Sequence, residues 1–383
     1  MYNPALSKSV LLVGMGWFPN TPGGLDRYVY ELTHHLAASQ VQVELCGVGL
    51  PTDQPTAEPI VMTNLAVPET QLLERLWHVR KNFVGRCLSQ PDAINLHFAL
   101  YGLPLLQAFP KDIPLTFTFH GPWALESQWE GHSRLSVLCK NWVEKQVYQR
   151  CDRFIVLSKA FGTILHQTYA VSWDKIHIIP GGVDTVRFQP NLSMHAAREK
   201  LGWLSDRKIL FAPRRLVHRM GLDKLLTAMV QVKQVVPEVW LAIAGKGSLR
   251  QTLEQQVQEL GLSDYVQFLG FLPDELLPVA YQAADLTVVP SQSLEGFGLI
   301  LVESLACGTP ALCTPIGGMP DVVAPLCPEL VTQSPSVDAI AERLIDLLNG
   351  TIPLPSRTAC RAYAQQKFDW QLIAPQVQKV LLA

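Results

Sequence analysis

Short apolar runs alternate with longer helical stretches along nearly the whole chain, and this alternation restricts the fold more than any other feature. Such runs are typical of strands buried in a parallel sheet. The first series comprises Val10–Val13, Val41–Cys46, Ala93–His97, Leu115–Phe119, Arg153–Leu157 and His177–Ile179. The second comprises Ile209–Ala212, Val239–Ala244, Val266–Leu269, Leu286–Pro290 and Pro310–Cys313. Strands that alternate with helices predict a doubly wound parallel-sheet α/β fold.

The two series are separated by a polar stretch near Asp184–Asn191. With 383 residues, the chain is also longer than one ordinary hydrophobic core accommodates. We therefore expect two Rossmann-like domains, over residues 1–183 and 184–366, followed by a final apolar helix within residues 367–383.

Composition excludes several classes of protein. A hydrophobic content of 48% with 17% charged residues indicates a globular chain, and a net charge of −2 does not support nucleic-acid binding. The eight cysteines show no CxxC pair and no metal-ligand spacing, so we interpret them as core thiols in a reducing compartment. No apolar run reaches the roughly 18 residues of a membrane span. We expect a cytoplasmic protein without a bound metal.

The stretch Ser291–Gly318 carries the strongest functional signal. A buried strand leads into a glycine loop, and a helical pattern begins at Phe297. A helix that begins just past the carboxyl end of a strand directs free N–H groups at a ligand, which favours phosphate. Glu295 and Glu303 lie eight residues apart around this point, where each could accept hydrogen bonds from sugar or ribose hydroxyls. The structural alternative is an ordinary strand–helix–strand unit with solvated glutamates.

Five elements of this stretch occur in the order Glu295, Gly296-Phe297-Gly298, Glu303, Gly308-Thr309-Pro310 and Gly317-Gly318. This pattern resembles the signature of the retaining nucleotide-sugar glycosyltransferases of family 4, which have the GT-B fold. The resemblance implies two domains facing each other across a cleft, with the helix of residues 367–383 crossing back to the first domain. It also implies transfer of a hexosyl group from a nucleoside-diphosphate sugar, with no further cofactor, to a hydroxyl-bearing acceptor with retention of configuration.

The resemblance also assigns roles to individual residues. Glu303 would hold the ribose, Glu295 the donor sugar, and the amides of Phe297, Gly298 and Leu299 the diphosphate. In the first domain, Gly23 and Gly24 would face the donor phosphates. His120, at the end of a predicted strand, would orient the transferred sugar. His97 also ends a strand, and we interpret it as structural.

Arginines cluster after the first strand of the second domain, as Arg214, Arg215 and Arg219. The planar guanidinium group binds two phosphate oxygens at once. The family has an arginine that matches Arg215 and a lysine where this chain has Met220. Either Arg219 supplies the second positive charge or diphosphate binding is weaker; we favour Arg219 and expect Met220→Lys to recover activity lost in Arg219→Ala.

Two stretches of the first domain, Leu72–Leu88 and Cys139–Arg153, are basic and amphipathic. We expect both to be core-packed helices with a solvated face; the alternative is peripheral contact with anionic lipid on the inner face of a membrane. Two other functions stay open. A sugar-nucleotide epimerase of the same fold would bind the donor without an acceptor, and a non-catalytic partner subunit would lack part of the site.

Overall fold

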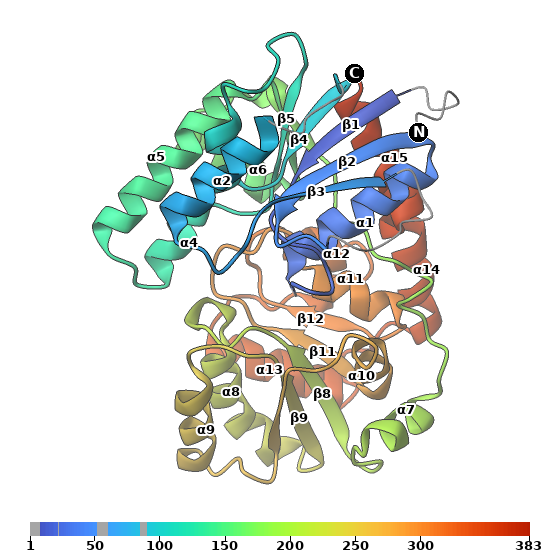
Figure 1. The fold of residues 1–383 in the computed structure, drawn as a ribbon. Coiled ribbons are helices and arrows are strands. Elements are labelled where there is room, and N and C mark those ends of the chain that lie inside the picture. The colour runs from blue at the N-terminus through green and yellow to red at the C-terminus, as the bar shows by residue number, and fades with distance from the viewer. Residues whose placement is uncertain (1–7, 22, 52–59, 85–89) are drawn as a thin grey trace. The chain divides into compact units, whose positions relative to one another are not determined.

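The computed structural model describes residues 8–21, 23–51, 60–84 and 90–383. The chain divides into two compact units, one formed by residues 1–182 with 370–383 and the other by residues 183–369 (Figure 1). The ranges expected from the sequence, 1–183, 184–366 and 367–383, differ from these by at most three residues. Each unit is a parallel sheet covered by helices on both faces.

The N-terminal unit contains a seven-stranded sheet in the order β3-β2-β1-β4-β5-β6-β7, in which every pair of neighbours is parallel. The strands are β1 (Lys8–Val13), β2 (Val41–Val48), β3 (Ile60–Ala66), β4 (Ala93–Leu96), β5 (Leu115–Phe119), β6 (Arg153–Val156) and β7 (Ile176–Ile178). Six of the seven match predicted runs. The prediction missed β3, an edge strand that carries Thr63 and Asn64 and is exposed at Val61, so it lacks the continuous apolar run of a central strand.

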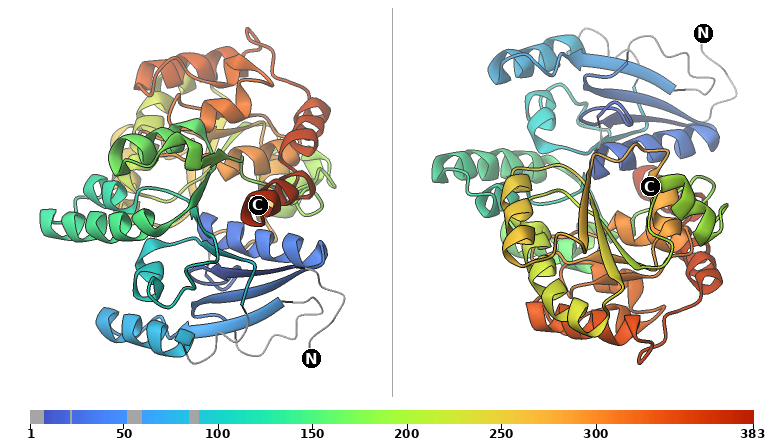
Figure 2. Two further views of the ribbon diagram at one scale, coloured as in Figure 1. Left: turned by 90° about the horizontal axis from the view of Figure 1, so that it is seen from above. Right: turned by 90° about the horizontal axis from the view of Figure 1, so that it is seen from below.

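Helices cover this sheet on two sides (Figure 2). Helices α1 and α15 pack together on one face, while α2, α3 and α5 lie around η1 on the other. The helices of this unit are α1 (Gly24–Ala38), α2 (Leu72–Val84), α3 (Ala99–Gly102), η1 (Leu103–Leu105), α4 (Trp123–Trp129), α5 (Arg134–Arg150), α6 (Lys159–Tyr169), η2 (Trp173–Lys175) and α15 (Trp370–Leu381). Of the predicted helix Leu72–Leu88, the last four residues lie outside the described residues.

Helix α15 is held in the N-terminal unit by Trp370. Its indole ring is buried and lies 5.1 Å from the ring of Tyr28, and a side chain at Gly182 would clash with it. Near the other end of α15, Arg153 donates to the carbonyl of Val380 at 3.0 Å. The final segment of the chain therefore completes the first unit.

The C-terminal unit contains a five-stranded parallel sheet in the order β10-β9-β8-β11-β12. Its strands, all predicted, are β8 (Lys208–Pro213), β9 (Val239–Ala244), β10 (Val266–Gly270), β11 (Leu286–Val289) and β12 (Ala311–Cys313). Its helices are α7 (Met194–Leu201), η3 (His218–Met220), α8 (Leu222–Val235), α9 (Arg250–Glu259), α10 (Leu277–Ala283), α11 (Leu299–Ala306), α12 (Met319–Val323), η4 (Pro328–Leu330), α13 (Val337–Leu348) and α14 (Arg357–Phe368). Helix α8 packs on α9 and α13, whereas α10 packs on α7 and α11.

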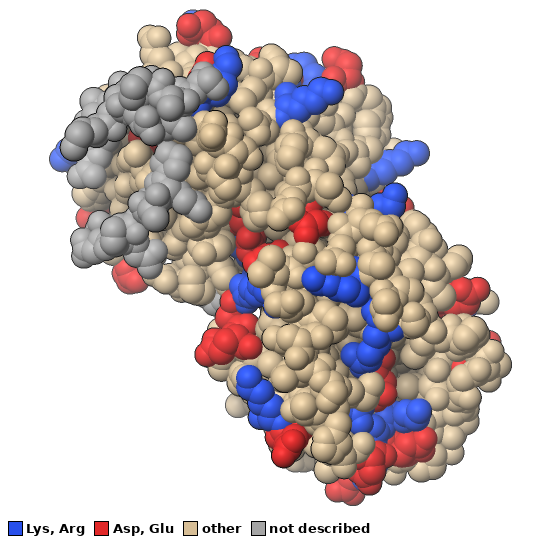
Figure 3. All heavy atoms as spheres, turned by 90° about the vertical axis from the view of Figure 1, so that its right-hand side faces the viewer, with Lys and Arg blue, Asp and Glu red and all other residues tan. Residues whose placement is uncertain are grey.

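Three expectations from the composition concern surface charge, membrane-spanning helices and the cysteines. On the face drawn in Figure 3, Lys and Arg side chains are interspersed with Asp and Glu. No helix in the described part of the chain is long and apolar enough to cross a bilayer. Every described cysteine is a free thiol, and five are buried, but Cys139 is exposed on α5 and is not the core residue that we predicted.

Candidate active site

Two loops of the C-terminal unit begin side by side. Strand β8 lies at the centre of its sheet, and the strand order reverses between β8 and β11. In open parallel sheets, ligands bind beyond the carboxyl ends of the strands at such a switch point. The loop after β8 starts at Arg214, and the loop after β11 carries Ser291 and Glu295. The topology thus brings an arginine cluster and a glutamate to one place.

Arg214 is the centre of this site. Its Nη2 atom lies 2.5 Å from Oε2 of Glu295 and also donates to the hydroxyl of Ser291. The sulfur of Met220 lies 2.6 Å from the same nitrogen. The Arg214 side chain is 5% exposed and that of Glu295 is 16% exposed, so the ion pair is largely removed from water. Sequence reasoning placed Arg214 in the cluster but gave it no role.

The charge state of Glu295 follows from these neighbours. Burial alone would raise its pKa, but the nearby charges of Arg214 and, more weakly, Arg219 hold the pKa below the usual value, with help from the Ser291 hydroxyl. Glu295 is therefore a carboxylate at neutral pH. One oxygen already accepts bonds from Arg214 and Ser291.

Two glycines allow the loops to approach closely. Gly317 has a φ of +60°, and a side chain there would clash with the carbonyl oxygen of Glu295, which accepts a hydrogen bond from Gly318 at 3.1 Å. Gly221 has a φ of +70° and lies against the carbonyl of Pro290. The contact at Gly317 folds the backbone of the segment Ser291–Gly318 onto itself around Glu295. The contact at Gly221 brings the loop after β8 against the end of β11.

The two other arginines differ in their surroundings. Arg215 is exposed, and its side chain makes no hydrogen bond with another residue in the part of the chain that the structure describes. Arg219 is buried, and its Nη1 atom donates to the carbonyl of Leu294 at 3.3 Å. Its own carbonyl accepts from the amide of Gln292 at 2.8 Å. Arg219 thus braces the loop that carries Glu295.

Helix α11 begins at Leu299, two residues later than the pattern predicted, with Gly298 as its N-cap. The ring of Phe297 is buried and lies 5.7 Å from that of Phe368, so this residue anchors the loop rather than the helix. From Leu301 to Ala306 every residue of α11 is buried. The amides of Phe297, Gly298 and Leu299 stay our candidates for binding phosphate.

Glu303 is buried in α11, and its Oε2 atom accepts a hydrogen bond of 2.8 Å from the hydroxyl of Tyr281 on α10. Sequence analysis did not identify Tyr281, because it lies 22 residues away on a different helix. The hydroxyl fixes one carboxylate oxygen of Glu303. This contact positions the side chain that we expect to hold a ribose.

In the N-terminal unit, His120 pairs with His97. Their strands, β5 and β4, are neighbours, and Nδ1 of His97 lies 3.1 Å from Nε2 of His120. Both rings contact the ring of Tyr28 on α1, at 6.1 Å and 4.9 Å between centroids. His97, which we interpreted as structural, therefore makes a hydrogen bond that fixes the ring of His120. The pairing of β4 with β5 is a property of the folded sheet, and it cannot be read from the sequence of either strand.

Burial of this pair has a measurable consequence. It lowers the pKa of His97 well below the usual value and that of His120 to about 3, so both rings are neutral near pH 7. The unfolded chain binds protons near pH 6.5, so the stability from this pair is complete above that pH and is lost as the pH falls toward 3. We expect the loss to reach about 1.4 kcal/mol per pH unit for each histidine.

Urea titrations between pH 7 and pH 4.5 would measure this slope, with the double variant His97→Asn/His120→Asn as the comparison. The double variant should lose less stability on acidification. Equal slopes would contradict the neutral, buried pair. Glu144, whose pKa burial raises to about 7, contributes in the opposite direction in both proteins, so it cancels in the difference.

Gly23 and Gly24 open helix α1, with Gly23 as its N-cap. Asp26, in the first turn, accepts a hydrogen bond of 3.0 Å from the amide of Gly16. Burial raises the pKa of Asp26, and the Gly16 hydrogen bond counteracts part of that effect. This bond ties the loop after β1 to the start of α1, at the switch point between β1 and β4.

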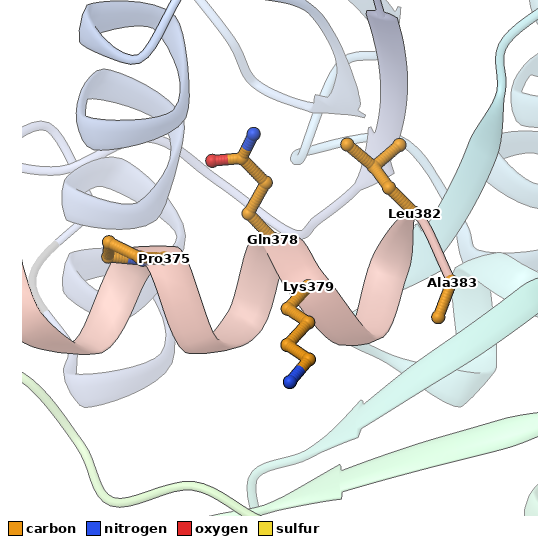
Figure 4. Close-up of a pocket in the computed structure, with 5 residues that line it drawn as sticks. All are labelled: Pro375, Gln378, Lys379, Leu382 and Ala383. Atoms are coloured by element: carbon orange, nitrogen blue, oxygen red, sulfur yellow. The ribbon is translucent and has the colours of Figure 1, made fainter.

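One depression lies apart from these residues. A depression on α15 is lined by Pro375, Gln378, Lys379, Leu382 and Ala383 (Figure 4). Its two polar side chains, Gln378 and Lys379, point in opposite directions from the helix, so they do not converge on a ligand. Among the described residues, no group of His, Cys, Asp and Glu is arranged to hold a metal ion.

Two parallel-sheet α/β units, with candidate residues at the switch point of each sheet, define the GT-B class of fold. Comparison with models of protein families identifies the family within this fold class. Residues 193–367 match glycosyl transferases group 1, and residues 22–187 match glycosyltransferase family 4. The chain belongs to this family of glycosyltransferases, which confirms the resemblance in the sequence.

Individual proteins with similar sequences are also glycosyltransferases. A GDP-mannose-dependent monoacylated alpha-(1-6)-phosphatidylinositol monomannoside mannosyltransferase from Corynebacterium glutamicum is 32% identical over 53% of this chain and 55% of its own length. The alignment therefore spans only about half of that relative. A D-inositol 3-phosphate glycosyltransferase from Segniliparus rotundus is 27% identical over 92% of this chain and 82% of its own.

Among solved structures, sucrose-phosphate synthase from Thermosynechococcus elongatus superposes with a TM-score of 0.79 and 25% identity. The superposition covers 97% of this chain and 98% of the other. This similarity over the full length supports the assignment of the GT-B fold.

Proposed function

We propose that this protein transfers a hexosyl group from a nucleoside-diphosphate sugar to a hydroxyl-bearing acceptor, with retention of anomeric configuration. The observation that carries the proposal is the ionised Glu295, held by Arg214 and Ser291 at the switch point between β8 and β11. Two similar proteins support the donor class: one relative is GDP-mannose-dependent, and a 20% identical structural neighbour from Anabaena was solved in complex with UDP-glucose.

Two kinds of group meet the donor in this proposal. The carboxylates of Glu295 and Glu303 accept hydrogen bonds from hydroxyls of the sugar and the ribose. Arg215, Arg219 and the amides of Phe297–Leu299 bind the diphosphate, whose charge grows as the bond to the sugar breaks. A positive cluster aimed at developing charge serves the function that a divalent ion serves in other transferases.

The neutral His120 completes the donor site in this proposal. A neutral imidazole has one N–H donor and one acceptor nitrogen. The bond to His97 occupies Nε2, which leaves Nδ1 of His120 for a sugar hydroxyl. His120 thus orients the sugar as a neutral hydrogen-bonding group, since its lowered pKa disfavours the imidazolium form at physiological pH.

Thermal-shift measurements with UDP, GDP and ADP sugars test the proposal directly. A ligand that binds only the folded state raises Tm, by an amount equivalent to about 2.7 kcal/mol at a hundredfold excess over Kd. We expect one base to stabilise the wild type and to stabilise Arg215→Ala less. Turnover should continue in excess EDTA. No shift with any nucleotide sugar, or loss of turnover that magnesium restores, would contradict the proposal.

A further inference from the structure

The N-terminal half of helix α5 contributes no buried residue to the core. Its buried residues, Glu144, Val147 and Tyr148, all lie in the C-terminal half, and none of residues 134–143 is buried. The buried half is held firmly, because Glu144 accepts a hydrogen bond of 2.8 Å from the hydroxyl of Tyr169. In Figure 1, α4 and the first half of α5 project away from the sheet of the N-terminal unit. This hairpin is therefore anchored at its base and exposed at its tip.

The exposed side of the tip is apolar. Leu135, Leu138 and Trp142 are 72%, 66% and 56% exposed. Their spacing of three and four residues places them on one side of α5. Trp129, at the end of α4, is also 56% exposed. A stripe of large apolar side chains on a projecting helix differs from the solvated polar face that we expected from the sequence.

Helix α2 repeats this feature on the same face of the sheet. It packs on η1, which α5 also contacts, and Figure 2 shows both helices on one side of the unit. On α2, Leu73 is 82% exposed and Trp77 is 56% exposed. The ammonium group of Lys81 lies 4.8 Å from the centre of the Trp77 ring. Apolar and basic side chains thus occur together on both helices, and α2 also carries an exposed acid, Glu74, which lies 3.7 Å from Nε2 of His78.

The charged side chains that α5 itself exposes are basic, and an acid, Glu130, follows Trp129 and lies 3.8 Å from Nε2 of His132. Helix α5 carries four basic residues, Arg134, Lys140, Lys145 and Arg150, and its single acid, Glu144, is buried. Arg134 and Lys145 are exposed at the two ends of the stripe. In a symmetric contact between two copies, the same surface would face itself and bring these like charges together. An anionic surface would instead attract them.

We propose that the exposed stripe of α5, with Trp129 and the matching face of α2, docks the protein on the surface of an anionic lipid bilayer. Tryptophan and leucine enter the boundary between headgroups and acyl chains, where the amphipathic indole ring is favoured. Arginine and lysine contact the lipid phosphates. The inference rests on the N-terminal unit alone and does not depend on the proposed reaction.

Vesicle sedimentation tests this surface. The full-length protein should sediment with mixed phosphatidylcholine–phosphatidylglycerol vesicles, remain in solution with pure phosphatidylcholine, and be released in part by salt. Leu138→Gln/Trp142→Gln should lower the partition coefficient about 10- to 100-fold, because each side chain loses the free energy of apolar burial. The matched control is Val235→Gln on α8, which removes an apolar residue that is 51% exposed from the C-terminal unit and should leave partitioning unchanged.

Three results would overturn the proposal. They are absence of sedimentation at low salt, equal binding by the double variant, and equal loss in the Val235→Gln control. Sedimentation velocity tests whether a second copy of the chain covers the stripe instead of a bilayer. If the wild type is a dimer and the double variant is a monomer, the stripe is a dimer interface. Since the readout is binding to vesicles, its failure would leave the nucleotide-sugar measurements unaffected.

Discussion

Arg214→Ala is expected to lower the free energy of unfolding of the C-terminal unit by about 3–5 kcal/mol. The cost arises because Glu295 would stay buried without its ion-pair partner, and a charge removed from water is strongly unfavourable. The loss should shrink as the pH falls, since the pKa of the abandoned carboxyl rises and its protonated form has no charge to bury. Denaturant titrations at pH 7 and pH 5 would measure both effects.

Arg215→Ala is the matched control, because it removes the adjacent arginine from an exposed position. Its effect on stability should stay within about 0.5 kcal/mol. Glu295→Gln in the Arg214→Ala background should restore part of the lost stability by removing the unpaired charge. Equal, small losses in Arg214→Ala and Arg215→Ala would show that the buried ion pair does not stabilise the unit.

The structure also corrects the expected effect of Met220→Lys. The sulfur of Met220 lies beside Nη2 of Arg214, so a lysine there would place two positive charges together in a buried position. Arg214 thus occupies the space next to Glu295 that a lysine at position 220 would enter. Met220→Lys should therefore compensate for the loss of Arg214, rather than for the loss of Arg219, and should destabilise the wild type.

Arg219→Ala is expected to lower kcat by about 100- to 1,000-fold, with a smaller change in KM, because it removes positive charge aimed at the departing diphosphate. A structural role is the competing explanation, since Arg219 donates to the carbonyl of Leu294, whose φ of +49° is unusual for leucine. Steady-state kinetics of two further variants separate the two explanations.

Arg219→Lys retains the charge, whereas Arg219→Gln retains a donor for Leu294 without the charge. We expect the lysine variant to keep more turnover than the glutamine variant, and all three variants to keep a wild-type Tm within a few degrees. If the glutamine variant matches the wild type in kcat, Arg219 only braces the loop. Arg215 would then be left as the arginine that meets the diphosphate.

Much of the fold could be predicted because burial on both faces of a parallel sheet leaves a continuous apolar run in each central strand. All five strands of the C-terminal sheet were found in this way. The edge strand β3 was missed because two polar residues, the buried Thr63 and the half-buried Asn64, interrupt its apolar run. The starts of helices were predicted less accurately than the strands. The predicted start of α11 at Phe297 is two residues too early, because Phe297 is a buried loop residue.

The sequence by itself determined the family, the two sheets and the segment that carries Glu295 and Glu303, because these depend on residue types at fixed spacing along the chain. Only the tertiary structure decided which of two adjacent arginines pairs with Glu295, and that His97 holds His120. Successive side chains of an extended segment point in opposite directions, so the side chains of Arg214 and Arg215 cannot both point at Glu295. Which of them points at Glu295 depends on where β11, which begins more than 70 residues later, enters the sheet. Contacts between neighbouring strands join residues that are distant in the chain, and no local pattern records them.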